Sequence, residues 1–201
     1  MITLRILYLI NYAGKAGTEK YVENLVRIFS AAGNECHFAY NIAGELSEKM
    51  AARGVPCLQL DLAGSPTAAA KVLAAYCREH KIEVIHAQYP RENIIALLSL
   101  RHYAAPRVVY TNHLTIRSGL KWRVLNRIFT PRDHRIIAVC REGRDIMVQN
   151  GVCPERIEVI YNGVEPEKYP VRDMSVRPEL GIGEGLSLIH ISEPTRHSLI
   201  S

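Results

Sequence analysis

The sequence predicts an α/β fold, a Rossmann-like parallel sheet with helices on both faces. Two observations carry this prediction. Short apolar runs with many β-branched residues alternate along the chain with longer stretches of helical periodicity. The short runs are apolar on both sides, as in strands that are buried between two layers of helices. In sheets built from such right-handed βαβ units, ligands bind outside the carboxyl ends of the strands.

Seven runs are predicted to be strands. The first lies close to the N-terminus, but it is too short to span a membrane and no small-residue cleavage signal follows it. We therefore interpret it as a buried strand and not as a signal peptide. The predicted strands, in chain order, are Leu4–Ile10, Glu35–Tyr40, Pro56–Leu60, Glu83–Ala87, Arg107–Thr111, Arg135–Val139 and Arg156–Ile160.

Six helices are predicted between these strands. In the first, the apolar residues return at helical spacing, and Gly33 with Asn34 marks its expected end. The predicted helices, in chain order, are Thr18–Ala32, Glu45–Arg53, Thr67–His80, Glu92–His102, Leu120–Phe129 and Glu142–Asn150.

The composition is that of a soluble globular protein. A chain of 201 residues suits one α/β domain with a little left over. The net charge of +5 permits an anionic partner without requiring one, and basic and aromatic residues do not interleave as they do in base-stacking proteins. We therefore expect no nucleic-acid partner. The five cysteines are scattered without a C-x-x-C pair, which favours reduced thiols in a cytoplasmic protein over disulfides or a metal site.

The loop between the first strand and the first helix contains Gly14, Gly17 and Thr18. Glycine lets the backbone approach a ligand closely, and the free N–H groups of a first helical turn attract an anion. The spacing disfavours both the dinucleotide fingerprint and the P-loop. The loop alone favours two interpretations equally: a site for a diphosphate or a phosphorylated acceptor, and a plain turn in which Thr18 caps the helix.

Two histidines, His86 and His113, stand at the carboxyl ends of neighbouring predicted strands. Arg91, five residues after the first of them, has a side chain suited to holding an anionic acceptor. A single histidine at such a position is more often a hydrogen-bonded structural residue than a functional one. Two histidines that converge on one site strengthen the functional interpretation of both.

The stretch from Arg117 to Arg135 interleaves basic and apolar residues. A basic amphipathic helix of this kind can rest on an anionic membrane, which would suit a lipid-linked acceptor. We favour the alternative of a surface helix whose apolar face packs on the sheet, because most amphipathic helices of globular domains do so.

Residues 186–196 read LSLIHISEPTR, which resembles the translated end of a sequencing-library adapter. We therefore treat residues 186–201 as an artefact, with a native amphipathic strand as the alternative. The expected organisation is a domain over residues 1–165, a linker with the start of a further domain over 166–185, and the adapter-derived tail.

From residue 134 onward the sequence resembles the hallmark of family 4 retaining glycosyltransferases. The hallmark is a strand ending in Ala-Val-Ser, a helix, a glycine, and a strand ending in Pro-Asn-Gly-Val-Asp. This chain has Ala138-Val139-Cys140, Gly151 and Tyr161–Glu165, with cysteine in place of serine and tyrosine in place of proline. Earlier family motifs match in order at Ala16–Glu19, Val84–Ala87 and Thr111–His113, where Ala16 replaces a glycine.

The resemblance implies the N-terminal half of a GT-B fold, in which two Rossmann-like domains face each other across a cleft. Such enzymes transfer a sugar with retention from a nucleotide-sugar donor, bound by the second domain, to an acceptor hydroxyl, bound by the first. No metal or other cofactor is expected, because helix N-termini and basic side chains stabilise the departing diphosphate. By itself the chain is expected to be inactive.

The resemblance also implies roles for individual residues. His113 would bond the transferred sugar or stabilise developing positive charge. The remaining positions would bind substrate: the first loop at the diphosphate and acceptor, the fourth-strand loop at the acceptor pocket, and an asparagine at the hinge between domains. They are Gly14, Gly17, Thr18, His86, Tyr89, Arg91 and Asn162.

The expected acceptor is a glycan, a lipid-linked compound or a small molecule, with cell-envelope glycan synthesis as the context. The expected location is the cytoplasm, with peripheral contact to the inner face of the membrane. Two alternatives remain: another GT-B enzyme such as a sugar-nucleotide epimerase, and a stand-alone non-catalytic ligand-binding module.

Overall fold

The computed structural model describes residues 3–163 and, beyond them, residues 178, 181 and 183. Within it, the described residues up to Asn162 form one compact unit. The expected linker and adapter-derived tail lie outside the described residues, apart from the three single positions.

Within residues 3–163 the sheet has seven strands, and every neighbouring pair is parallel, as predicted. Their order is β3-β2-β1-β4-β5-β6-β7. The strands are β1 (Arg5–Tyr12), β2 (Glu35–Ile42), β3 (Cys57–Gln59), β4 (Val84–Ala87), β5 (Arg107–Asn112), β6 (Arg135–Ala138) and β7 (Ile157–Val159).

In the described part of the chain all six predicted helices are present, together with two short 3₁₀ turns, η1 (Thr130–Arg132) and η2 (Pro154–Arg156). Helix α4 begins at Pro90, two residues before the predicted start, because proline is well suited to a first helical turn. The helices are α1 (Gly17–Ala31), α2 (Glu45–Ala52), α3 (Pro66–Glu79), α4 (Pro90–Ser99), α5 (Leu120–Phe129) and α6 (Arg141–Gln149).

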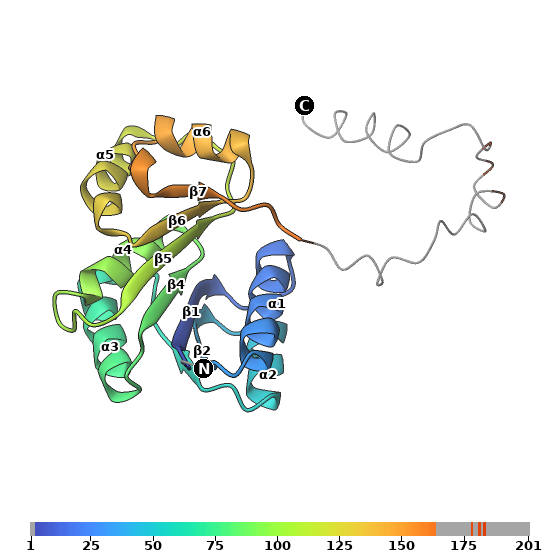
Figure 1. Cartoon of the computed structure of the whole chain (residues 1–201), viewed down its shortest axis with the longest axis vertical. Helices are drawn as coiled ribbons and strands as arrows, with labels where there is room; N and C mark the ends of the chain where they lie inside the picture. The colour runs from blue at the N-terminus through green and yellow to red at the C-terminus, as the bar shows by residue number, and fades with distance from the viewer. Residues whose placement is uncertain (1–2, 164–177, 179–180, 182, 184–201) are drawn as a thin grey trace. The chain divides into compact units, whose positions relative to one another are not determined.

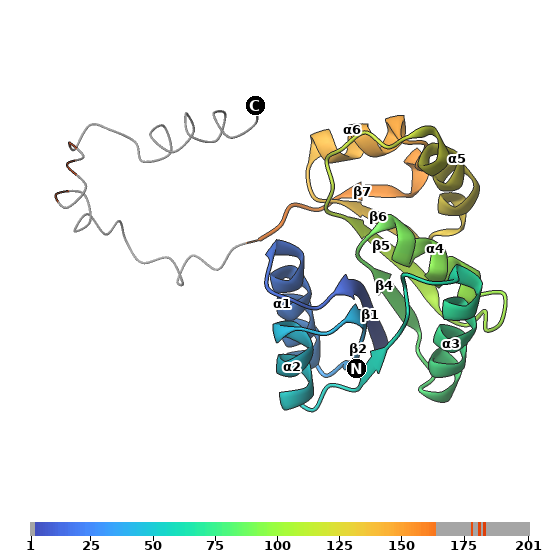
Figure 2. The same cartoon turned by 180° about the vertical axis from the view of Figure 1, so that it is seen from behind.

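Helices α1 and α2 cover one face of the sheet and α3 and α4 cover the other, as Figures 1 and 2 show. On the first face, Val22 and Met50 pack against Tyr8 of β1. On the second, Leu73 and Ile95 pack against the alternate side chains of β1. This alternation is why β1 is apolar from Ile6 to Ile10, and it confirms the predicted two-layer covering.

A smaller core lies at the β6–β7 end of the sheet. Met147 of α6 packs there with Tyr110 of β5, Ile136 of β6 and Val152. At the start of α6, the sulfur of Cys140 accepts a hydrogen bond from the Gly143 N–H (3.2 Å). The cysteine thus occupies the N-cap position, where serine is the usual acceptor.

The strand order reverses direction between β1 and β4, which are neighbours in the sheet. From β1 the chain crosses to β2 through α1, and from β4 it crosses to β5 through α4 on the opposite face. The loops after β1 and β4 therefore diverge and leave a crevice, which is where open α/β sheets bind ligands.

Candidate functional site

A polar cluster lies at this point of reversal, at the carboxyl ends of β1, β4 and β5. It combines the first turn of α1, the segment after β4 and the residue that follows β5. Its members are Thr18, Tyr21, Gln88, Tyr89 and His113. The structure thus brings three predicted site residues together, Thr18, Tyr89 and His113.

His113 is held by a buried amide. Gln88 is fully buried, and its Nε2 group donates to the His86 carbonyl (3.2 Å), so its Oε1 atom faces the His113 ring (3.0 Å). Because a carbonyl oxygen only accepts, the Nε2 atom of His113 carries the proton. The lone pair of the neutral ring then resides on Nδ1 and is available to a hydroxyl group.

The ring of His113 also lies among aromatic side chains. The Tyr21 ring meets it edge-on at 5.0 Å between centroids, and the Tyr89 ring is 6.1 Å away. Burial in these surroundings lowers the pKa of His113 to about 4. The imidazole is therefore neutral at physiological pH, so it is suited to hydrogen bonding and not to carrying a charge.

His86 lies beneath this cluster and does not reach its surface. The side chain is buried in the sheet, and its Nε2 atom is 2.7 Å from the Thr111 hydroxyl oxygen. Burial, with a further contribution from nearby His113, lowers its pKa to about 3. In this structure His86 supports the neighbouring strand through Thr111, whereas the family resemblance implied a place at the border of an acceptor pocket.

The first turn of α1 is open toward this edge. The first helical hydrogen bond runs from the Lys20 N–H to the Ala16 carbonyl (3.0 Å), so the N–H groups before it have no helical acceptor. A Cβ atom built on Gly17 would meet no other atom within 4 Å, whereas one on Gly14 would collide with the Tyr12 ring. Gly17 is thus the glycine where a ligand can approach the backbone.

Thr18 is not the helix cap, so that interpretation is wrong. The N-cap position is Ala16, whose side chain makes no capping hydrogen bond. Thr18 lies one residue inside the helix, and its hydroxyl accepts a hydrogen bond from the Tyr89 hydroxyl (2.9 Å). This bond joins the loop after β4 to the start of α1 across the crevice.

Arg91 has a different environment from the one expected. Its guanidinium donates to the carbonyls of Ala63 and Gly64 (2.8 Å each) and to that of Leu62. It therefore holds the loop that precedes α3. Asn162 is exposed, three residues after the end of β7.

Gln88 and Tyr21 were not among the site residues predicted from the sequence. A signal for each exists: Gln88 directly follows β4, and Tyr21 lies three residues after Thr18, on the same face of α1. What the sequence does not show is that Gln88 turns inward and fixes the His113 tautomer.

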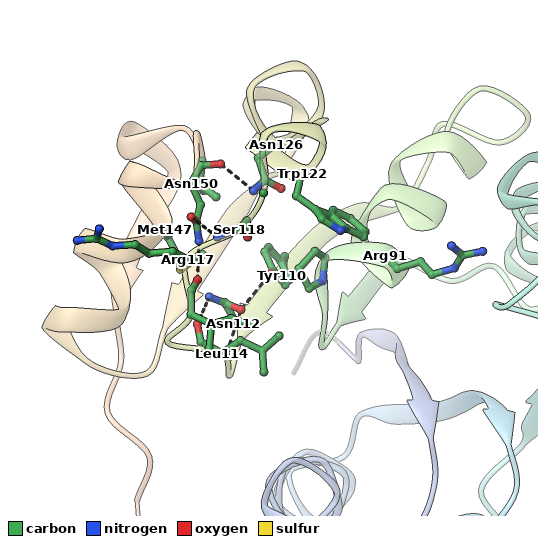
Figure 3. Close-up of a pocket in the computed structure, with 14 residues that line it drawn as sticks. Arg91, Tyr110, Asn112, Leu114, Arg117, Ser118, Trp122, Asn126, Met147 and Asn150 are labelled. Atoms are coloured by element: carbon green, nitrogen blue, oxygen red, sulfur yellow. Dashed lines mark hydrogen bonds between the residues drawn. The ribbon is translucent and has the colours of Figure 1, made fainter. Parts of the chain in front are cut away.

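A cavity of about 360 Å³ lies on the other side of the β5 terminus, between the segment after β5, α5 and α6 (Figure 3). The apolar side chains that line it include Tyr110, Leu114, Ile116, Trp122 and Met147. In Figure 3 the Arg91 side chain extends away from the labelled group around Tyr110 and Asn112, in keeping with its carbonyl contacts.

The asparagine side chains of this cavity are engaged within the protein. The Asn112 Oδ1 atom accepts from the Tyr110 hydroxyl (3.1 Å), and its Nδ2 group donates to the Leu114 carbonyl (2.9 Å). The Asn150 Oδ1 atom accepts from the Ser118 N–H (2.8 Å), and its Nδ2 group donates to the Ile116 carbonyl (2.9 Å). The two asparagines hold the 113–119 segment over an apolar space.

Within the described part of the chain, no group of three or more His, Cys, Asp or Glu side chains is arranged to hold a metal ion. In the same residues, no helix is both long enough and apolar enough to span a membrane.

A family model described as Glycosyltransferase Family 4 matches residues 16–168. The match covers well over half of the chain, and the chain belongs to this family. The family resemblance seen in the sequence motifs is thereby confirmed. No curated protein matches the sequence.

Solved glycosyltransferase structures share the fold. A glycosyltransferase from Rickettsia africae has a TM-score of 0.73 at 12% identity, over 92% of this chain and 51% of that one. Anabaena HepE in complex with UDP-glucose has a TM-score of 0.70 at 17% identity, over 89% and 50%. The lipopolysaccharide outer core galactosyltransferase WaaB has a TM-score of 0.64 at 13% identity, over 81% and 46%. The fold is thus the Rossmann-like domain of a GT-B glycosyltransferase, and the chain spans about half the length of these proteins.

Proposed function

We propose that the protein transfers a sugar, with retention, from a nucleotide-sugar donor to an acceptor hydroxyl. In this proposal the described domain binds the acceptor, and a second domain binds the donor. Membership of glycosyltransferase family 4 supports transfer over epimerisation or a stand-alone binding module. HepE, which shares the fold, forms a complex with UDP-glucose, and this supports a nucleotide-sugar donor.

The observation that carries the proposal is the neutral His113 at the point where the strand order reverses. Its Nε2–H group is committed to Gln88, so its Nδ1 atom accepts a hydrogen bond from a hydroxyl of the transferred sugar. A neutral acceptor also favours the partial positive charge that develops on the sugar as its bond to the diphosphate breaks.

The opposite wall of the crevice supplies donors. The free N–H groups at the start of α1 are suited to bind a negatively charged group, and Gly17 leaves room for one. We assign the departing diphosphate to this helix start and to basic side chains of the donor domain, without a metal ion. If turnover persists in excess EDTA, this assignment is supported. If EDTA abolishes turnover and Mg²⁺ restores it, the assignment is contradicted.

The experiment that tests the function uses a protein that also contains the donor-binding domain. We expect His113→Ala to lower kcat by about 10- to 100-fold, the loss typical of one transition-state hydrogen bond. His102→Ala is the matched control, because His102 lies in an exposed turn after α4. Equal kcat values for wild type and His113→Ala, with the fold intact by circular dichroism, would refute the role of His113.

We also propose that the protein acts on the cytoplasmic side of a membrane and touches it through α5. In the structure the two sides of this helix have different surroundings. Trp122, Leu125 and Phe129 face inward and are half-buried, so this side packs on the domain, in agreement with the interpretation favoured from the sequence.

The other side of α5 is not covered by described residues. Leu120, Val124 and Ile128 are spaced four residues apart, so they form a single outward stripe, and they are 75%, 49% and 52% exposed. No Asp or Glu occurs between Asn93 and Arg132. An exposed apolar stripe within a purely basic stretch suits an anionic lipid surface.

Co-sedimentation with lipid vesicles tests this contact. We expect binding to phosphatidylcholine vesicles that contain phosphatidylglycerol, and loss of binding when the three stripe residues are replaced by serine. If the triple variant binds the vesicles as well as the unchanged chain does, α5 is not the contact.

A further inference from the structure

The cavity beside α5 does not have the character of a sugar site. Sugars are recognised through many hydrogen bonds, but the polar groups of Asn112 and Asn150 already bond to the 113–119 segment. The volume of about 360 Å³ falls within the range of small-molecule sites, about 300–1,000 Å³. Its lining therefore selects an apolar group by shape and contact.

A second hollow of about 320 Å³ adjoins this cavity. The two share Arg117, Ser118 and Asn150 in their linings, and the second adds Arg123 and Gln149. Neither Arg117 nor Arg123 has a side-chain hydrogen bond or ion pair with any residue that the structure describes, and both side chains are exposed. Figure 3 shows the Arg117 side chain extending outward from the labelled residues of the cavity.

Along the chain, the segment that carries these arginines has charged residues of one sign only. The nearest acidic residue before them in the sequence is Glu92, whose buried carboxyl belongs to α4, and the nearest after them is Asp133, which is also buried. Two exposed guanidinium groups without carboxylate partners form a site for an anion, and arginine matches the geometry of phosphate oxygens.

We propose that the two adjoining spaces bind an anionic amphiphile, with its hydrocarbon chain in the apolar cavity and its phosphate head between Arg117 and Arg123. Where the proposed function holds, this ligand is a lipid-linked acceptor or its lipid carrier, so the inference deepens the acceptor assignment. Amphiphile binding itself does not depend on sugar transfer.

Trp122 makes the binding measurable, since it is the only tryptophan of the chain and it lines the cavity. Three probes distinguish the contributions of the hydrocarbon chain and the phosphate: decyl phosphate, decanol and inorganic phosphate. Decyl phosphate is used below its critical micelle concentration. We expect decyl phosphate to shift the Trp122 emission saturably, decanol to bind about tenfold more weakly, and inorganic phosphate to leave the emission unchanged. Added salt should weaken the binding of decyl phosphate but not that of decanol.

Two variants assign the contacts. The double variant Arg117→Gln/Arg123→Gln should bind decyl phosphate about tenfold more weakly and should bind decanol with unchanged affinity. Leu114→Gln should weaken both, because Leu114 lines the cavity and is exposed enough (39%) to be replaced without loss of fold. Arg107→Gln is the matched control, since this exposed arginine lies at the amino end of β5, and the cavity lies beyond the carboxyl end of that strand.

Each outcome decides the proposal. Equal affinity for decanol and decyl phosphate, or a double variant that binds decyl phosphate normally, would overturn the phosphate site. Emission that responds equally to inorganic phosphate would overturn the hydrocarbon site, and an emission that none of the probes changes would overturn both. Since the assay needs no donor, a protein that binds decyl phosphate but transfers no sugar would disprove the proposed function alone.

Discussion

Replacing Gly17 with alanine separates ligand approach from folding. Gly17 is the first residue of α1, is exposed and does not have a positive φ, so alanine fits its backbone without strain. A Cβ at this position meets no atom within 4 Å. The protein's own packing therefore does not require a glycine here.

The expected effects on stability and on activity have opposite signs. Gly→Ala at a compatible position stabilises by about 0.4–1 kcal/mol, because the unfolded chain loses freedom. For a domain of this size, that raises Tm by about 1–4 °C. A methyl group in space that a ligand must occupy costs about 1–3 kcal/mol, which lowers kcat/KM about 5- to 150-fold.

The assay is thermal unfolding of the chain together with steady-state transfer by a protein that contains both domains. A higher Tm combined with a lower kcat/KM supports the open helix start as part of the substrate site. Because the two effects oppose each other, a damaged fold cannot imitate the result. An unchanged kcat/KM would show that no ligand approaches Gly17, and the reasoning from its open space would fail.

Two further predictions concern stability. Arg91→Ala should lower the free energy of unfolding by about 2 kcal/mol, or Tm by about 4–8 °C, because the carbonyls of the 62–64 loop lose their donor. The control is Arg101→Ala, at an exposed arginine. An unchanged Tm with a raised KM for the acceptor would instead support a binding role for Arg91. Burial raises the pKa of Asp133 to about 8, from 3.8 in the unfolded chain, so its protonated form stabilises the fold at low pH and this contribution is lost as pH rises toward 8. Asp133→Asn should therefore flatten the fall of Tm between pH 5 and pH 8, within the window set by those two pKa values, and an equally steep fall in the variant would contradict the assignment.

The sequence predicted most of the fold because local patterns carry it. All seven strands and six helices were predicted in order, since apolar runs and helical periodicity follow directly from burial on a two-sided sheet. The predicted ends differ by only a few residues, as at α4, where proline at the helix start moves the boundary.

The site was predicted in part. His113 was singled out because it follows the carboxyl end of a strand, where ligands of parallel sheets bind, and Tyr89 was named through the family resemblance. The sequence could not tell His86 from His113, since both stand at such ends. The structure separates them: one ring is buried against Thr111, and the other faces the crevice with its tautomer fixed by Gln88.

By itself the sequence determined the element order, the parallel sheet and the family, because these depend on residue type and spacing along the chain. The tertiary structure decided which side chains are available to a ligand. Arg91 turned to the carbonyls of a loop 27–29 residues away in the sequence, and Trp122 turned toward a cavity formed with β5 and α6. The physical reason is that a side chain's partners are set by contacts between distant segments, and such contacts exist only after the chain has folded.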